Sequence, residues 1–380
     1  MVICFDATVE AKRALDVLLQ TGQFRDTSEV VSMALANYEV LQRSVSSGDP
    51  LLVADAPQVR IENSRLGAQR ASGPRLSKPA ASQPQIPELF LLNSATAGDV
   101  KLANVPAATE RTAASLPPAQ WLFGQYNKFL PVKASCRALL NLLRERTGSV
   151  VLAEAVEAIS QAAWELGDYL YTSDQRGGRP REDAFAAAFP TTASNGPLSR
   201  IRFGNQFVGN LRQPKQAEGQ PKETKFTGFP AALRLMLCTG GKSPALELTT
   251  AGAEFGLLPS PILDSSQEQA ERKFSEAEIA FLLAHISSSV PEETSAYSAI
   301  LDAVQSGANT PDAVDAYLRQ RFNLPTEQAI TQTFLTTQRT GAISRLADLG
   351  LIAREKQGLR VTYLLTSKGN DLRSRLTTKD

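Results

Sequence analysis

The chain has 380 residues, 42% of them hydrophobic, and a formal net charge of +1. Because this length exceeds what one hydrophobic core usually holds, we expect two or three domains. No apolar run is as long as a membrane span and the N-terminus lacks a secretory signal pattern, so we expect a cytoplasmic protein without membrane contact.

The composition also limits the chemistry. The three cysteines, Cys4, Cys136 and Cys238, stand far apart, and His285 is the lone histidine. Zinc sites with the usual Cys/His spacing are therefore excluded. His285 lies in an apolar helical stretch, which favours packing over catalysis. Since neither a Gly-rich phosphate loop nor a nucleophile cluster is present, we expect no enzyme, no cofactor and no metal site.

Residues 1–45 have the pattern of one short strand followed by two helices. The strand spans residues 2–5, and Gly22 separates two stretches with helical apolar spacing. One strand and two helices bury too little apolar surface to fold alone. We therefore expect a homodimer that forms through this N-terminal unit.

The second helix of this unit carries a family resemblance. The stretch TGQFRDTSEVVSMAL, residues 21–35, is similar to the ParD-like antitoxin branch of the ribbon-helix-helix family. The resemblance implies that Val2 and Cys4 face the DNA major groove and that Thr27 and Ser28 hold a phosphate. Val2 and Cys4 read bases poorly, however, and residues 1–50 hold four Lys/Arg against seven Asp/Glu. The unit either dimerises and reads DNA, or dimerises only.

Residues 46–120 are rich in Ala, Ser, Pro and Gln, and no helical or strand period persists. This composition predicts a flexible linker. An apolar island at Pro87–Ser94 leaves a second interpretation open, namely a segment that becomes ordered on binding a protein partner.

The next predicted domain covers residues 121–264. We expect helices near 139–143, 152–171, 182–189, 197–209 and 230–237, and a strand at 246–248. The helix at 197–209 places Arg200, Arg202, Asn205 and Gln206 among apolar residues, and residues 199–234 hold seven Lys/Arg against two Asp/Glu. This local positive charge predicts that these four residues contact DNA.

The last predicted domain covers residues 265–380. Its first part, residues 265–333, is acidic, with four Lys/Arg against ten Asp/Glu, and predicts support helices at 276–286, 291–304 and 311–322. From residue 334 onward the order is an amphipathic helix, a stop at Gly350, a strand, a basic turn, a second strand and a capped helix. This order resembles the second half of a winged-helix DNA-binding domain.

That resemblance implies two sets of DNA contacts. The helix would present Thr337, Gln338, Arg339, Ser344 and Arg345 to the major groove. The hairpin, or wing, would present Arg354, Lys356 and Arg360 to the DNA backbone or the minor groove. Residues 334–380 hold nine Lys/Arg against four Asp/Glu, which favours phosphate contact. Alternatively, the helix face is only solvated, and Arg345 pairs with Asp348 across one turn.

The two predicted domains share an ending, in which a strand finishes in Leu-Thr-x-x-Gly and enters a helix. It occurs at residues 248–252 and again at 365–369. The repeat implies tandem winged helices. We therefore expect a mainly α protein with short β hairpins, built from a ribbon-helix-helix unit and two winged-helix-like domains.

The predicted function is sequence-specific binding of double-stranded DNA by a dimeric prokaryotic transcriptional regulator. A control protein of a plasmid or mobile element is a close variant, because tandem winged helices also resemble plasmid replication initiators. The alternative is a protein-interaction module, such as an antitoxin or an assembly subunit, whose winged helices mediate packing only.

The dimer prediction can be tested on residues 1–50 alone. We expect a dimer in sedimentation, and we expect Phe5→Glu to unfold or dissociate it. Burying an unpaired carboxylate costs on the order of several kcal/mol, which is more than so small a core can absorb. A stable folded monomer would contradict the prediction.

Overall fold

The computed structural model describes residues 85–92, 100, 102–103, 116–146, 149–180, 184–194, 196–212, 224–241, 243–264, 272–324, 331–358 and 360–377. The chain divides into Met1–Pro79 and Ala80–Asp380, and both predicted winged-helix domains fall within the second unit. The predicted ribbon-helix-helix unit, with Val2, Cys4, Thr27 and Ser28, lies outside the described residues.

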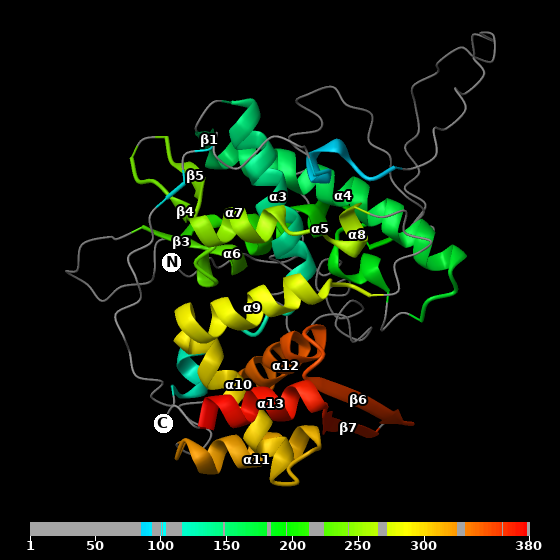
Figure 1. The fold of residues 1–380 in the computed structure, drawn as a ribbon, viewed down its shortest axis with the longest axis vertical. Helices are drawn as coiled ribbons and strands as arrows, with labels where there is room; N and C mark the ends of the chain where they lie inside the picture. The colour runs from blue at the N-terminus through cyan, green and yellow to red at the C-terminus, as the bar shows by residue number, and fades with distance from the viewer. Residues whose placement is uncertain are drawn as a thin grey trace, which may run out of the picture. The chain divides into compact units, whose positions relative to one another are not determined.

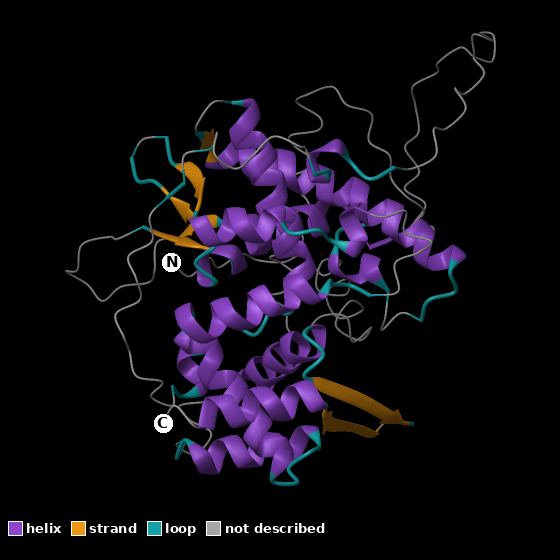
Figure 2. Cartoon of the chain, in the orientation of Figure 1, coloured by secondary structure: helices purple, strands orange, loops and turns teal. Residues whose placement is uncertain are grey.

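Helices dominate the described residues, with a few short strands (Figure 2). This confirms the expectation of a mainly α protein. The part before residue 265 contains η1 (Glu88–Phe90), η3 (Pro118–Gln120), α3 (Phe129–Glu145), β1 (Val150–Val151), α4 (Leu152–Arg176), η4 (Phe185–Ala188), η5 (Thr192–Ser194), α5 (Gly196–Phe203), the π-helix η6 (Gly204–Val208), β2 (Asn210–Arg212), β3 (Lys225–Thr227), α6 (Phe229–Ala232), β4 (Met236–Cys238), β5 (Ala245–Leu248), α7 (Thr250–Leu257) and α8 (Pro261–Asp264).

The part after residue 271 is simpler, with several consecutive helices along the chain followed by one hairpin and a last helix (Figure 1). Its elements are α9 (Glu276–Ser289), α10 (Pro291–Gln305), α11 (Pro311–Arg321), α12 (Gln332–Asp348), β6 (Ile352–Gln357), β7 (Arg360–Leu365) and α13 (Ser367–Thr377). None of the helices in the described part of the chain is both long and apolar enough to cross a membrane.

The helices with strong apolar periodicity are confirmed, and two weaker predictions are wrong. The segment expected as a helix at 230–237 is helical only in α6, because Arg234 takes a φ of +58° and the chain continues as β4. The segment expected at 182–189 contributes the 3-10 turn η4. Alternating Leu and Ala in a short run fits a strand as well as a helix, so periodicity alone cannot decide.

Part of the expected linker is packed rather than flexible. Phe90 in η1 is fully buried in the core. Asn141 of α3 donates hydrogen bonds to the carbonyls of Leu89 and Leu91, both at 2.9 Å. The described part of the apolar island, residues 87–92, therefore lies against a helix of this chain.

The two hairpins are joined to the helices that follow them in the same way. Thr249 caps α7, and Thr366 accepts a hydrogen bond from the Gly369 amide at the start of α13. Thr249 N–H donates to the Leu235 carbonyl at 3.1 Å, and Thr366 N–H donates to the Leu351 carbonyl at 3.2 Å. The Leu-Thr-x-x-Gly repeat thus marks one geometry used twice, which we call the threonine joint.

The glycine of each threonine joint is required by close packing. A Cβ on Gly252 would lie 2.0 Å from the Leu235 carbonyl oxygen, and one on Gly369 would lie 2.1 Å from the Leu351 oxygen. The hairpins differ in their neighbours, because β5 also pairs with β1 to form a sheet of order β1-β5-β4, whereas β6 and β7 form a two-stranded sheet.

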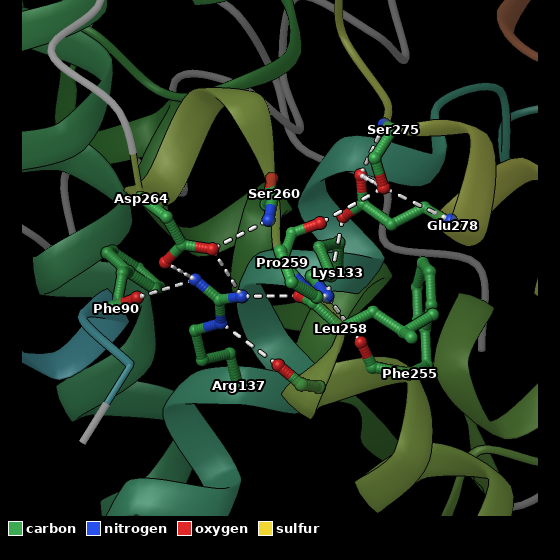
Figure 3. A network of polar contacts seen from close by, with 11 residues as sticks. Phe90, Lys133, Arg137, Phe255, Leu258, Pro259, Ser260, Asp264, Ser275 and Glu278 are labelled. Atoms are coloured by element: carbon green, nitrogen blue, oxygen red, sulfur yellow. Dashed lines mark hydrogen bonds and ion pairs between the residues drawn. The ribbon is translucent and has the colours of Figure 1, made fainter. Parts of the chain in front are cut away.

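Two buried cationic side chains on α3 donate hydrogen bonds to carbonyl oxygens at the C-terminal end of α7 (Figure 3). Lys133 donates to the carbonyls of Phe255 and Leu258, and Arg137 donates to the carbonyl of Gly256 at 3.0 Å. A helix ends in carbonyls that lack partners within the helix and carry partial negative charge, so cations are stabilising there. Arg137 also forms an ion pair with Asp264 in α8.

Lys133 also connects α3 to α9. Glu278 lies 3.3 Å from the Lys133 ammonium, and its side chain accepts from the Ser275 amide at 2.8 Å in a capping box (Figure 3). Burial lowers the pKa of Lys133 to about 8, although Glu278 opposes this shift. The structure thus joins the two predicted winged-helix regions through buried charge.

The lone histidine, His285, gives a clean test of the fold in solution. Its Nε2 lies 2.7 Å from the Leu233 carbonyl oxygen, and burial lowers its pKa below 6.5. The unfolded chain therefore binds a proton that the folded chain does not, so the free energy of unfolding falls as pH falls below about 6.5. We expect its NMR titration midpoint below 6.5, and we expect His285→Gln to weaken this pH dependence. A midpoint at or above 6.5 would contradict the packing described.

Candidate nucleic-acid interface

The helix predicted to enter the major groove, α12, is buried on two sides. Leu335, Ile343 and Leu346 pack into the core of their own region. A second buried stripe, formed by Gln338, Gly341 and Arg345 at helical spacing, packs against the segment that precedes α3.

The second stripe is held by contacts to main-chain atoms. Gln338 donates to the Pro118 carbonyl at 3.0 Å, and Arg345 donates to the Tyr126 carbonyl. A Cβ on Gly341 would lie 2.1 Å from the Gly124 oxygen. The backbone of residues 118–126 thus occupies the space that a DNA groove edge would need.

The two arginines predicted to contact bases are scaffold residues instead. Arg345 is fully buried and forms a bidentate ion pair with Glu293 of α10, with Nη2 2.7 Å from Oε2. Arg339 is buried, lies 2.6 Å from Asp315 of α11 and donates to the Tyr363 hydroxyl of β7 at 3.1 Å. Arg339 therefore holds the hairpin against α11.

The expected exposed, groove-facing surface of α12 is thus wrong for Gln338, Arg339, Ser344 and Arg345, all of which are buried. Thr337 is half-buried and donates to the Thr333 carbonyl of its own helix. The alternative pairing of Arg345 with Asp348 is also wrong. The polar residues of α12 pair with distant acidic residues of α10 and α11, which helical periodicity does not reveal.

The four residues predicted on the earlier helix lie on α5 and η6. Arg200 donates to Glu157 and Gln161 of α4, both at 2.8 Å, and is not free for DNA. Arg202 is exposed, whereas Asn205 and Gln206 are half-buried.

The predicted contact residues on the hairpin are exposed to solvent. Arg354, Lys356 and Arg360 are all exposed, and Glu355 is the hairpin's acidic residue. Figure 1 shows the strands reaching beyond the neighbouring helices. Gln357 pairs with Arg360 across the ladder, next to Gly358 with a φ of +61°.

Further cations gather at the root of the hairpin. Lys128, before α3, and Lys273, before α9, lie 3.7 and 3.5 Å from Asp348 at the end of α12. Burial lowers the pKa of Lys128, and the charges of Lys273 and Arg354 lower it further, while Asp348 opposes them. The Asp348 carboxylate thus forms ion pairs with both Lys128 and Lys273. We call Lys128, Lys273, Arg354, Lys356 and Arg360 the basic strip.

A hollow of about 580 Å3 lies at this root, lined in part by Lys273, Asp348 and Lys368. Sequence reasoning missed Lys128 and Lys273 because they come from segments far from the hairpin. The basic strip offers phosphate oxygens several cations, and no base-reading helix accompanies it among the described residues.

Comparison of the chain with protein-family models, with curated proteins and with solved structures gave no match.

The scaffold role of Arg345 is testable by urea denaturation. We expect Arg345→Met to lower the free energy of unfolding by about 3–5 kcal/mol, because Glu293 would stay buried without a partner. The exposed Arg360→Ala serves as the matched control and should change stability by less than about 0.5 kcal/mol. Equal, small effects of both substitutions would place Arg345 at the surface.

Proposed function

We propose that this protein binds double-stranded DNA through the basic strip, which contacts the phosphate backbone, while α12 serves as a structural helix. The observation that carries the proposal is the contrast between the two predicted contact sets. The hairpin cations are exposed, whereas the helix arginines are buried and paired.

The order of elements supports a winged-helix interpretation of residues 272–377. Helices α10, α11 and α12 are followed by the β6–β7 hairpin and α13. The repeated threonine joint supports a related element at β4–β5 and α7. On this interpretation the hairpin is a wing that contacts DNA, and the helix that usually reads bases has been enclosed by residues 118–126.

Backbone contacts alone give affinity but little sequence preference. Sequence selection, if the protein is a regulator, then rests on the N-terminal unit, whose resemblance to ribbon-helix-helix proteins implies a dimer that reads DNA. In that arrangement the basic strip adds sequence-independent affinity next to the recognised site. The proposal therefore assigns the two ends of the chain different tasks.

The enclosure of α12 favours a second candidate, the protein-interaction module. If packing is the only task of this region, the basic strip is a solvated surface and binds no DNA. The two candidates predict different behaviour with salt, because phosphate contacts release counterions and protein packing does not.

The test uses the full chain and a variant that carries Arg354→Gln, Lys356→Gln and Arg360→Gln. Each phosphate contact contributes a slope of about 0.9 to log affinity against log salt, so loss of three contacts should lower the slope by roughly 2.7. Affinity should fall equally for all duplex sequences. Arg146→Gln, an exposed arginine that pairs with Glu154 outside the basic strip, should change neither quantity.

Binding would be measured by fluorescence anisotropy on several unrelated duplexes at several salt concentrations. If the triple variant keeps both the affinity and the salt slope of the natural chain, the basic strip does not contact DNA. The protein-interaction candidate would then take precedence.

A further inference from the structure

A second hollow, of about 340 Å3, lies between the segment before α3 and the helices α5 and η6. Its volume falls within the range of small-molecule sites, roughly 300–1,000 Å3. Its polar lining residues are Gln125, Asn127, Lys128, Ser199, Arg202 and Gln206. Three phenylalanines, Phe189, Phe203 and Phe207, contribute apolar lining.

The charge around this hollow is unbalanced. Two cations line it, and none of its lining residues is a carboxylate. Arg202 is exposed and forms no ion pair with any residue that the structure describes. Lys128 shares Asp348 with Lys273, and burial, together with the charges of Lys273 and Arg354, lowers its pKa. An anion in the hollow would provide the missing negative charge.

The backbone beside the hollow is unusual. η6 is a π-helical turn, a rare element that occurs frequently at functional sites. A Cβ on Gly204 would lie 2.7 Å from the Ser160 hydroxyl oxygen, so the turn packs closely on α4. The turn places Gln206 at the hollow, where its amide donates to the Gln125 side chain at 3.3 Å.

The lining therefore combines three chemistries. The cations suit a phosphate group, the side-chain amides suit the polar edge of a heterocycle, and the phenylalanines provide apolar contact for its ring. The rings of Phe189 and Phe203 stack with their centroids 5.8 Å apart, and both side chains are buried. They therefore form a packed apolar part of the lining.

We propose that this hollow binds a small phosphorylated ligand of nucleotide size, with its phosphate between Lys128 and Arg202 and its base near Gln125 and Gln206. The site shares Lys128 with the basic strip, but the inference rests on the lining of the hollow and does not depend on DNA binding. A mononucleotide is the ligand class that uses all three kinds of lining residue.

The experiment is isothermal titration calorimetry of the full chain with the four common nucleoside monophosphates. Adenosine and inorganic phosphate are the probes for the two halves of the ligand. We expect at least one nucleotide to bind more tightly than either half. Arg202→Gln should weaken this binding at least tenfold, since a charge-assisted hydrogen bond is lost.

The matched control is Arg200→Gln. Arg200 lies on the same helix but pairs with Glu157, so its removal should leave nucleotide affinity unchanged. Gln206→Glu is a second variant that places a carboxylate in the hollow, and it should weaken binding, because the carboxylate would compete with the phosphate for the cations of the lining. Circular dichroism melting would verify that each variant is folded.

Two results would overturn the inference. The first is that no nucleotide binds at millimolar concentration; if Arg202→Gln then weakens duplex binding, the hollow is assigned to the DNA backbone. The second is that Arg202→Gln and Gln206→Glu, both folded, bind as tightly as the natural chain. Loss of DNA binding in the hairpin variant with nucleotide binding intact would leave the inference standing.

Discussion

Buried cations that donate to main-chain carbonyls hold the described residues together. Lys133 and Arg137 bind the last carbonyls of α7, and Arg345 binds the Tyr126 carbonyl. A buried cation needs several partners. Its transfer out of water costs on the order of several kcal/mol unless an opposite charge and hydrogen bonds compensate. Each of these side chains therefore fixes the relative position of at least two chain segments. The placement of α12 and of the hairpin follows from these contacts.

Enclosure of α12 removes the surface through which the predicted recognition helix would contact DNA. A groove-reading helix must offer polar side chains to solvent, but Gln338 and Arg345 are committed to the segment at 118–126. Arg339 joins Asp315 to Tyr363 and sets the direction of the hairpin instead. The cationic side chains that remain exposed to water are instead those of the strands, Arg354, Lys356 and Arg360.

The sequence predicted the elements better than their surfaces. Apolar spacing located α3, α4 and α9 to α12, and Gly350 marked the end of α12, where its φ is +69°. The buried arginines could not be foreseen, because Glu293 and Asp315 lie far away in sequence and a charged stripe looks like a solvated face. Gly341, a glycine inside a helix, was the one local sign of close packing. Lys128 and Lys273 are brought to the root of the hairpin only by the tertiary fold.

The β6–β7 hairpin is a two-stranded sheet, so each strand has an outer edge that no strand of the described residues covers. Exposed edges invite pairing with strands of other molecules, and charged side chains oppose this by keeping the edge hydrated and mutually repulsive. Arg354, Glu355 and Lys356 line one strand in succession and so protect it from such pairing. By contrast, β5 in the first hairpin is covered by β1. The exposed charges of the hairpin thus oppose edge-to-edge pairing between molecules, independently of the proposed contact with DNA.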